Sequence, residues 1–237
     1  MDYVIADIHG CAKTLTALVR QLSLQPEDKL YFLGDYIDRG PGSKQVLDYL
    51  MQLSNPAYFL VGNHEEYMLA SIDAEQERQQ RFSWFRGQNR ALHHWKSYGG
   101  NATLRSFGVD NPLQIEPKYI DFLRQLRSNY YVELEHHILV HAGFDFSQDD
   151  VFANKHAMTH IEDFSVNPEK VHHKTIIHGH MSVSLEFTQQ LIAHQHTNHY
   201  IDIDSGCVYQ ERQGQGFLNA FCLQTNQLIS QHNIDIF

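Results

Sequence analysis

The chain has 237 residues, of which 42% are hydrophobic and 19% are charged, and its formal net charge is −10 with histidine neutral. This composition is typical of a folded globular protein. The acidic balance argues against non-specific binding to nucleic acid or to an anionic membrane surface. The three cysteines, Cys11, Cys207 and Cys222, lie far apart without a CxxC pair, so we expect neither a disulfide framework nor a thiolate zinc site.

The beginning of the chain has no basic segment followed by a long apolar run, and no stretch is long and apolar enough for a membrane helix. We therefore expect a cytoplasmic protein without a membrane span. Seventeen histidines stand out, because histidine is both a metal ligand and a general acid or base.

Three successive units in the first third of the chain have the same order of strand, polar loop and helix. Short apolar runs at residues 3–5, 30–33 and 58–61 predict the strands. Helical spacing of apolar residues follows each run, for example Leu15, Leu18, Val19 and Leu22 after the first. This alternation predicts a largely parallel sheet, in which the polar loops meet at the carboxyl ends of the strands.

The segment from about residue 73 to about 118 is rich in glutamine and arginine and predicts a helical insertion over the site. Its aromatic residues Trp84, Phe85 and Trp95 either wall a substrate groove or pack between helices. Further strands are predicted at residues 133–140, 175–178, 200–204 and 217–223, the last two as neighbours. No repeat or linker divides the chain, so we expect one domain over residues 1–237.

Five polar motifs follow predicted strands. In chain order they are D-x-H-G at residues 7–10, G-D-x-x-D-R-G at 34–40, G-N-H-E at 62–65, H-A-G at 141–143 and H-G-H at 178–180. Aspartate, asparagine and histidine supply oxygen and imidazole ligands without a thiolate, a set that suits manganese, iron or zinc. The combination of the first three motifs, each at the end of a strand, is far more specific than any one of them.

The second and third motifs also carry the groups that phosphate chemistry requires. Asp35 is placed centrally enough to bridge two metal ions. Arg39 offers a planar fork for two phosphate oxygens. His64 with Asp38 forms the imidazole–carboxylate pair of a general acid.

Together these motifs resemble the phosphoprotein phosphatase family of metallophosphoesterases, which has the first three in this order. The short length and the segment at residues 95–104 resemble its bacterial and phage serine/threonine protein phosphatases. The resemblance implies a single calcineurin-like α/β domain. It would be a four-layer sandwich in which helices flank a central two-sheet β-sandwich, with a dinuclear metal centre at one edge.

The resemblance also implies a role for each motif residue. The implied metal ligands are Asp7, His9, Asp35, Asn63, His141 and His180. Asp35 would bridge two divalent ions, with manganese expected first and iron, zinc or nickel as alternatives. His64, oriented by Asp38, would protonate the leaving oxygen. Arg39 and Asn63 would contact the phosphoryl group. A hydroxide that bridges the metals would attack phosphorus in line.

One departure from the family concerns the phosphate contacts. The family usually places a second phosphate-binding arginine between the H-A-G and H-G-H segments, but residues 144–177 contain no arginine. The candidates for a second cation are the lysines of that segment, Lys155, Lys170 and Lys174, and the arginines Arg86 and Arg90 of the insertion.

The leading hypothesis is a serine/threonine protein phosphatase that acts on a phosphoprotein or phosphopeptide. The alternative enzyme is a symmetrical diadenosine tetraphosphate hydrolase, or a hydrolase of other nucleotides or small phosphate esters. A third hypothesis is an inactive scaffold that binds phosphorylated partners, and the presence of every implied ligand speaks against it.

Overall fold

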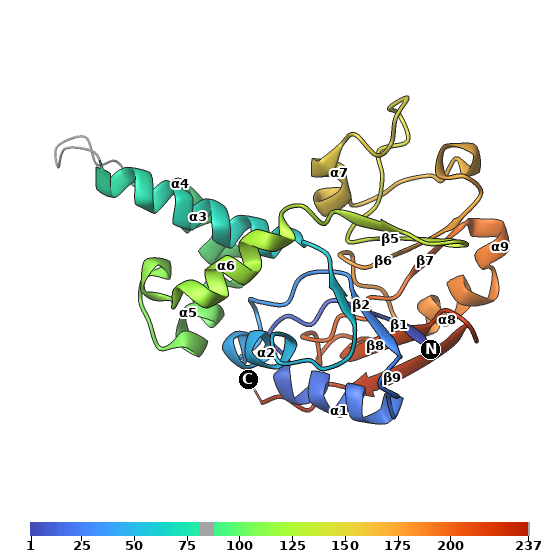
Figure 1. The fold of residues 1–237 in the computed structure, drawn as a ribbon, viewed down its shortest axis with the longest axis horizontal. Helices are drawn as coiled ribbons and strands as arrows, with labels where there is room; N and C mark the ends of the chain where they lie inside the picture. The colour runs from blue at the N-terminus through green and yellow to red at the C-terminus, as the bar shows by residue number, and fades with distance from the viewer. Residues whose placement is uncertain (81–87, 237) are drawn as a thin grey trace.

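Two β-sheets lie face to face at the centre of the fold (Figure 1). The computed structural model describes residues 1–80 and 88–236. The five-stranded sheet has the order β3-β2-β1-β8-β9 and contains β1 (Asp2–Ile5), β2 (Lys29–Phe32), β3 (Ala57–Phe59), β8 (Phe217–Cys222) and β9 (Gln227–His232). The four-stranded sheet has the order β4-β5-β6-β7 and contains β4 (Tyr131–Glu133), β5 (His137–Val140), β6 (Thr175–His178) and β7 (Tyr200–Asp202).

The expected βαβ beginning is confirmed. β1 and β3 both pair in parallel with β2, and β5, β6 and β7 form a second parallel group. The helices that follow the first three strands are α1 (Ala12–Leu22), α2 (Ser43–Leu50) and α3 (Asn63–Gln80). The carboxyl ends of the parallel strands therefore point the same way within each sheet, and their loops gather at one edge.

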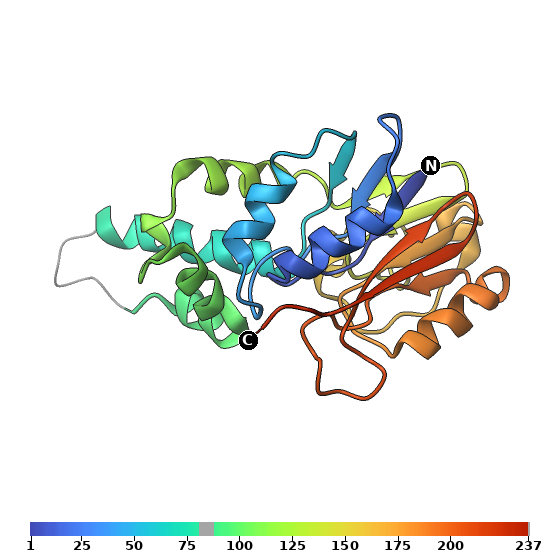
Figure 2. The same ribbon diagram turned by 90° about the horizontal axis from the view of Figure 1, so that it is seen from below.

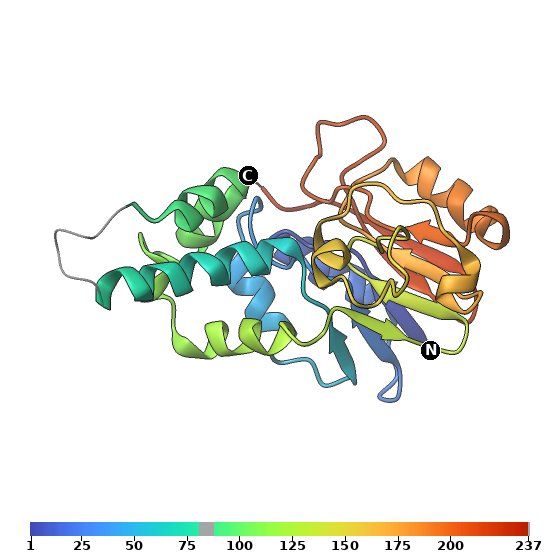
Figure 3. The same cartoon turned by 90° about the horizontal axis from the view of Figure 1, so that it is seen from above.

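Alternation along the strands divides the core into layers. Val4 of β1 packs between the sheets with Leu139 and Ile177, whereas its neighbour Ile5 packs on the other face with Leu15 of α1. Figure 2 shows α1 along the strands β8 and β9 of the first sheet. The outer face of the second sheet is covered by α7 (Lys155–His160) and its flanking loops, through Met158 (Figure 3). This is the expected sandwich flanked by helices.

A group of helices lies together at one side of the sheets (Figure 1). It contains most of α3, followed by α4 (Arg90–Trp95), a π-helical turn (Lys96–Gly100), α5 (Asn101–Phe107), a 3-10 turn (Pro112–Gln114) and α6 (Pro117–Leu126). The helical segment expected at about 73–118 falls in this group. Trp84 and Phe85 lie outside the described residues, and Trp95 is fully buried in the core rather than facing a groove.

The remaining elements complete the second sheet. A 3-10 turn (Pro168–Val171) precedes β6, and α8 (Leu185–Ala193) and α9 (Gln195–Asn198) connect β6 to β7. In residues 1–80 and 88–236, no helix combines the length and apolar character that crossing a membrane requires.

Two strand predictions were wrong. Residues 133–140 contain the last residue of β4, an exposed turn and the whole of β5, which pairs antiparallel with β4. β7 and β8 are not neighbours, because the chain passes from one sheet to the other between them and only a single bridge, Ser205 to Phe217, joins these segments. The strand β9, which pairs with β8, was not predicted, because its sequence is largely polar and has no continuous apolar run.

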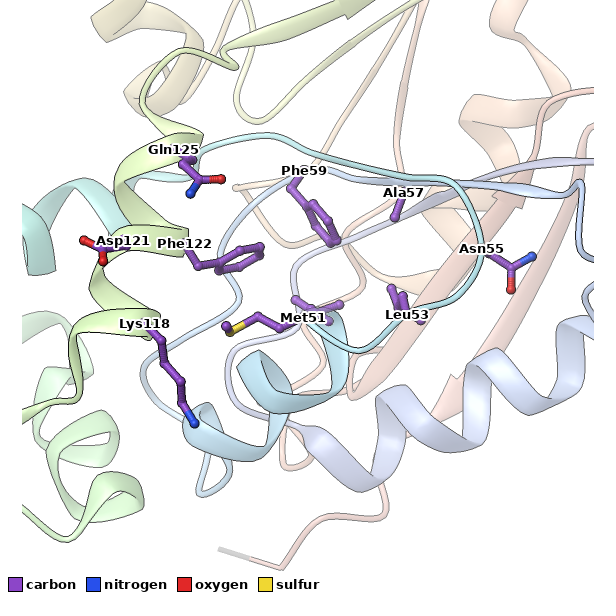
Figure 4. A pocket seen from close by; sticks show the side chains of 10 residues that line it. Met51, Leu53, Asn55, Ala57, Phe59, Lys118, Asp121, Phe122 and Gln125 are labelled. Carbon is purple, nitrogen blue, oxygen red and sulfur yellow. The ribbon is translucent and has the colours of Figure 1, made fainter.

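A cavity of about 400 Å³ opens beside the edge strand β3 (Figure 4). Met51 and Leu53 after α2, Phe59 of β3 and Phe122 of α6 line it. None of the predicted site residues reaches this cavity.

Candidate metal centre and active site

The structure brings all the predicted site residues to the edge where the parallel strands end. Asp35, which follows β2, lies at the centre. Its carboxylate is 3.5 Å from His9 Nε2, 3.6 Å from His141 Nε2 and 3.9 Å from His64 Nε2. His9 and His141 come from the loops after β1 and β5, and His64 comes from the first turn of α3, so residues far apart in sequence meet around one carboxylate.

Several site residues have a left-handed backbone. The φ angles are 46° at His9, 51° at Asp35, 71° at Asp38, 64° at Arg39 and 75° at His180. L-residues adopt this region at an energetic cost, and such strain concentrates at functional sites where surrounding contacts enforce it. Part of that enforcement is visible here, since the amides of Ile8 and His9 both donate to the Asp35 carbonyl, at 3.0 and 2.8 Å.

Two glycines of the motifs allow loops to touch. A Cβ at Gly62 would overlap the Asp35 side chain, and a Cβ at Gly40 would overlap the His9 carbonyl oxygen. Any larger residue at Gly62 would therefore push the central carboxylate out of position.

Glu65 ties the second and third motifs together. Its carboxylate accepts the backbone amides of Asp35 at 2.9 Å, Tyr36 at 2.9 Å and Gly62 at 3.0 Å. Glu65, the last residue of the G-N-H-E motif, therefore holds the loop that carries Asp35 in place.

The histidines face the centre with a lone pair. Nδ1 of His9 lies 3.0 Å from the Ile37 carbonyl, and Nδ1 of His141 lies 3.1 Å from the Leu33 carbonyl. A carbonyl can only accept, so we assign the hydrogen to Nδ1 and the lone pair to Nε2, the atom nearest Asp35. Burial lowers the pKa of both histidines and lowers that of His180 to about 3, which favours the neutral form that binds metals.

The residues present fit two metal ions. Ligand atoms of Asp35, His141 and His180 lie within 4.8 Å of one another. His9 and Asp35 belong to a second such group, whose third member is His64, the expected proton donor. Asp35 belongs to both groups, as a bridging ligand must. The amide of Asn63, from the same edge, lies 3.2 Å from His141 Nε2.

Asp7 gives a second argument for cations at this edge. Its Oδ2 accepts the His180 amide at 3.0 Å, whereas its buried Oδ1 has no hydrogen-bond partner among the described residues. Burial and the nearby charges of Asp204 and Asp35 raise the pKa of Asp7. A cation beside Oδ1 would supply the missing partner and restore the ionised form.

His64 and Asp38 form the expected pair. His64 Nδ1 lies 2.8 Å from Asp38 Oδ2, and both side chains are fully buried. The same Oδ2 accepts the Trp95 indole N–H at 2.8 Å, and Oδ1 accepts the Thr103 hydroxyl at 2.6 Å. His64 Nε2 is buried and has no hydrogen-bond partner in the described part of the chain. The imidazole is thus fixed through one nitrogen while the other faces the centre.

Sequence reasoning missed the roles of Trp95 and Thr103. Trp95 is 57 residues from Asp38, and no spacing rule connects them. The structure shows that the helical group holds the carboxylate that orients His64.

Arg39 points into the site, where its Nη1 lies 2.7 Å from His9 Nε2. The lysines considered as a second cation have other contacts. Lys170 donates to the Phe146 and Gln148 carbonyls, and Lys174 donates to Glu133.

The other candidates for a second phosphate-binding cation are Lys155, Arg86 and Arg90. The Lys155 ammonium sits 5.1 Å from the centroid of the Tyr130 ring. Arg86 lies outside the described residues, and Arg90 begins α4. The structure adds an arginine that the sequence did not suggest: Arg212 stacks on the Tyr209 ring at 3.6 Å, and the same ring is 5.8 Å from Arg39.

Comparison with known proteins agrees with this geometry. The family model for calcineurin-like phosphoesterases matches residues 3–210, and the chain belongs to this family. It is therefore a metallophosphoesterase, as the motifs indicated, and it has the fold and hydrolase class expected from them.

The proteins to which this chain is similar have names that state different substrates. The symmetrical bis(5'-nucleosyl)-tetraphosphatase of Salmonella paratyphi A is 44% identical over 69 residues, which are 29% of this chain and 24% of that protein. The match thus spans about a quarter of the length of such curated relatives.

Two solved structures share the fold over nearly the whole chain. One, provisionally described as a diadenosine tetraphosphatase, covers 97% of this chain and 91% of its own, with a TM-score of 0.59 and 21% identity. The other is a serine/threonine phosphatase from Saccharomyces cerevisiae with similarity to human phosphatase PP5. It covers 100% and 81%, with a TM-score of 0.59 and 14% identity. At these identities the likeness is one of fold alone.

Proposed function

We propose that the chain hydrolyses phosphate esters and that His64 donates the proton to the leaving oxygen. The observation that carries this proposal is the buried pair of His64 and Asp38, in which Nδ1 is held at 2.8 Å and Nε2 is left without a hydrogen-bond partner among the described residues. An imidazole oriented in this way presents one nitrogen to the substrate at a fixed angle, as a general acid requires.

The other residues bind and orient the phosphoryl group. Arg39 would contact two of its oxygens, and the amide of Asn63 would contact a third. The six proposed ligands, Asp7, His9, Asp35, Asn63, His141 and His180, would hold two divalent ions, of which manganese is our first choice. When bound, these ions supply positive charge to the phosphoryl oxygens and lower the pKa of water.

For the substrate, we propose phosphoserine and phosphothreonine in a protein or peptide. The support is the resemblance of the G-N-H-E motif and of the segment around Trp95 to protein phosphatases. A second candidate is symmetrical hydrolysis of a dinucleoside tetraphosphate, supported by the 44% identity to enzymes with that name over 69 residues.

The test compares both substrates on one preparation. The protein is stripped of metal, reloaded with manganese, and assayed with matched phosphoserine, phosphothreonine and phosphotyrosine peptides beside diadenosine tetraphosphate. Fast release of phosphate from the first two peptides, with an intact dinucleotide, supports the protein phosphatase. Formation of ADP with slow peptide turnover supports the second candidate, and no turnover of any ester at any metal loading refutes both.

A further inference from the structure

A cluster of rings lies beside His64 and takes no part in the chemistry described above. We name it the ring cluster. Its members are Tyr67 of α3, His94 of α4, Tyr98 of the π-helical turn, and His156 and His160 of α7. The helical group and the second sheet thus contribute to it from opposite sides of the site, and Figure 3 shows α7 next to the beginning of α3.

Two inner rings lie closest to the proposed proton donor. The centroid of Tyr67 is 5.9 Å from that of His64, and the centroid of Tyr98 is 6.3 Å from it. Tyr67 and Tyr98 are 5.0 Å apart. Tyr67 lies four residues after Asn63 on α3, so this ring is on the same face of the helix as a proposed phosphoryl-binding residue.

Outer rings continue the surface away from His64. His94 lies 4.6 Å from Tyr67 and 4.8 Å from Tyr98. On the other side, His160 lies 5.4 Å from Tyr67 and stacks on His156 at 4.2 Å with an interplanar angle of 11°.

Three members of the cluster are open to solvent, whereas Tyr67 and His160 are half-buried. Tyr98 is 43% exposed, and His94 and His156 are also exposed, whereas Trp95 beside them is fully buried. Rings that served only to pack helices would bury their faces, as Trp95 does. Exposed rings 4 to 6 Å apart are instead a surface on which another planar ring can stack or pack edge to face.

We propose that the ring cluster is the subsite for the leaving group and that it takes a planar aromatic ring carried by that group. This inference rests on one part of the proposed function, the role of His64, which places the leaving oxygen, and hence the leaving group, next to Tyr67 and Tyr98. It favours substrates with a ring in the leaving group over phosphoserine and phosphothreonine, whose leaving groups have none. The ring has two sources: a phenol bonded directly to the leaving oxygen, or a nucleobase joined to it through ribose and two phosphates, as in the ADP that leaves in symmetrical hydrolysis of diadenosine tetraphosphate.

The two sources differ in reach. A phenol on the leaving oxygen contacts only the inner rings, Tyr67 and Tyr98. A nucleobase sits farther from the reacting phosphorus and contacts the outer rings as well. Substitution of the outer His94 therefore distinguishes the sources, while substitution of Tyr98 tests the subsite itself.

The experiment uses the manganese-loaded enzyme with Tyr98→Leu, His94→Ala and a matched control, Tyr58→Leu. Tyr58 is 46% exposed, like Tyr98, but it lies on the edge strand β3 and stacks on Tyr31. The kcat/KM of each variant is measured on a phosphotyrosine peptide, on diadenosine tetraphosphate, and on a phosphoserine peptide without aromatic residues.

In Tyr98→Leu we expect kcat/KM to fall about tenfold further on a ring-bearing substrate than on the phosphoserine peptide. In Tyr58→Leu we expect no difference among substrates. An added selective loss on the dinucleotide in His94→Ala identifies a nucleobase, and selectivity confined to Tyr98→Leu and the phosphotyrosine peptide identifies a phenol. Equal losses on all substrates, or a wild-type enzyme that turns over only the ring-free peptide, overturn the inference and leave the proposed function intact.

A binding measurement separates failure of the subsite from failure of the function. The affinities of ADP and of inorganic pyrophosphate are compared on the same proteins by calorimetry. If the ring cluster binds the base, the wild type prefers ADP and Tyr98→Leu loses that preference, even if no ester is hydrolysed. Equal preference in the two proteins refutes a nucleobase on this surface.

Discussion

Replacing His64 with asparagine tests the proton donor. Nε2 of His64 is buried, lies 3.9 Å from Asp35 Oδ2, and has no hydrogen-bond partner in residues 1–80 and 88–236, while Nδ1 is held by Asp38. Asparagine cannot donate a proton to a leaving oxygen, so the whole contribution of general acid catalysis is lost. Such catalysis typically accounts for about 10²- to 10⁴-fold in rate, and we expect kcat to fall by that factor on esters with poor leaving groups.

The assay is a series of phosphate esters that runs from alkyl esters to p-nitrophenyl phosphate. An alkoxide needs a proton to depart and p-nitrophenolate hardly does, so His64→Asn should lose far less activity on p-nitrophenyl phosphate. The wild type should show a shallow dependence of kcat on the pKa of the leaving group, and the variant a steep one.

Metal content is the necessary control for this variant. His64 lies within 4.8 Å of ligand atoms of His9 and Asp35, so it is placed closely enough to act as a ligand instead. Equal losses across the ester series, or loss of a metal ion in His64→Asn, would refute the assignment of His64 as the acid.

Three further substitutions test the rest of the site. Asp35→Asn should remove at least one metal ion, because a neutral amide cannot replace a bridging carboxylate, and retention of two ions by elemental analysis would contradict the bridge. Arg39→Ala should raise KM and lower kcat together in steady-state assays, and unchanged values would place the phosphate contact elsewhere. Trp95→Phe removes a 2.8 Å hydrogen bond to the buried Asp38 carboxylate. It should lower the free energy of unfolding by about 1.5–3 kcal/mol in denaturant titrations. It should also make kcat depend more steeply on the pKa of the leaving group, because Asp38 would orient His64 less well. An unchanged slope would mean that Trp95 serves only in packing.

The motif residues could be predicted because local rules position them. Parallel strands end at a common edge, so the loops that begin at Asp7, Asp35 and Asn63 had to lie near one another. The metal-ligand types in these loops then indicated the chemistry. The structure agrees, since Asp35 lies within 4 Å of three imidazoles from other loops.

Contacts between distant segments could not be predicted in this way. Period-two alternation reports which residues of a strand are buried, but not which of two sheets the strand joins, and so β7 and β8 were wrongly paired. Likewise, nothing in the spacing of Tyr67 and His160 shows that α3 and α7 bring their rings within 5.4 Å. Arg212 and Arg39 both lie near the Tyr209 ring, and no spacing rule connects these two arginines, which are far apart in the sequence.

The π-helical turn after α4, with Trp95 directly before it, contacts residues to which we assign acid catalysis, phosphate binding and the leaving group. Trp95, directly before the turn, donates to Asp38, and the carbonyl of Gly99 accepts the backbone amide of Arg39 at 3.3 Å. Tyr98 lies between them in the sequence and belongs to the ring cluster, where it contacts Tyr67 and His64. None of these contacts involves Asp7, His141 or the other proposed metal ligands. Changes in this turn should therefore alter the choice of substrate and the strength of acid catalysis while the metal content stays the same, and a variant of the turn that lost metal before it lost selectivity would contradict that division of roles.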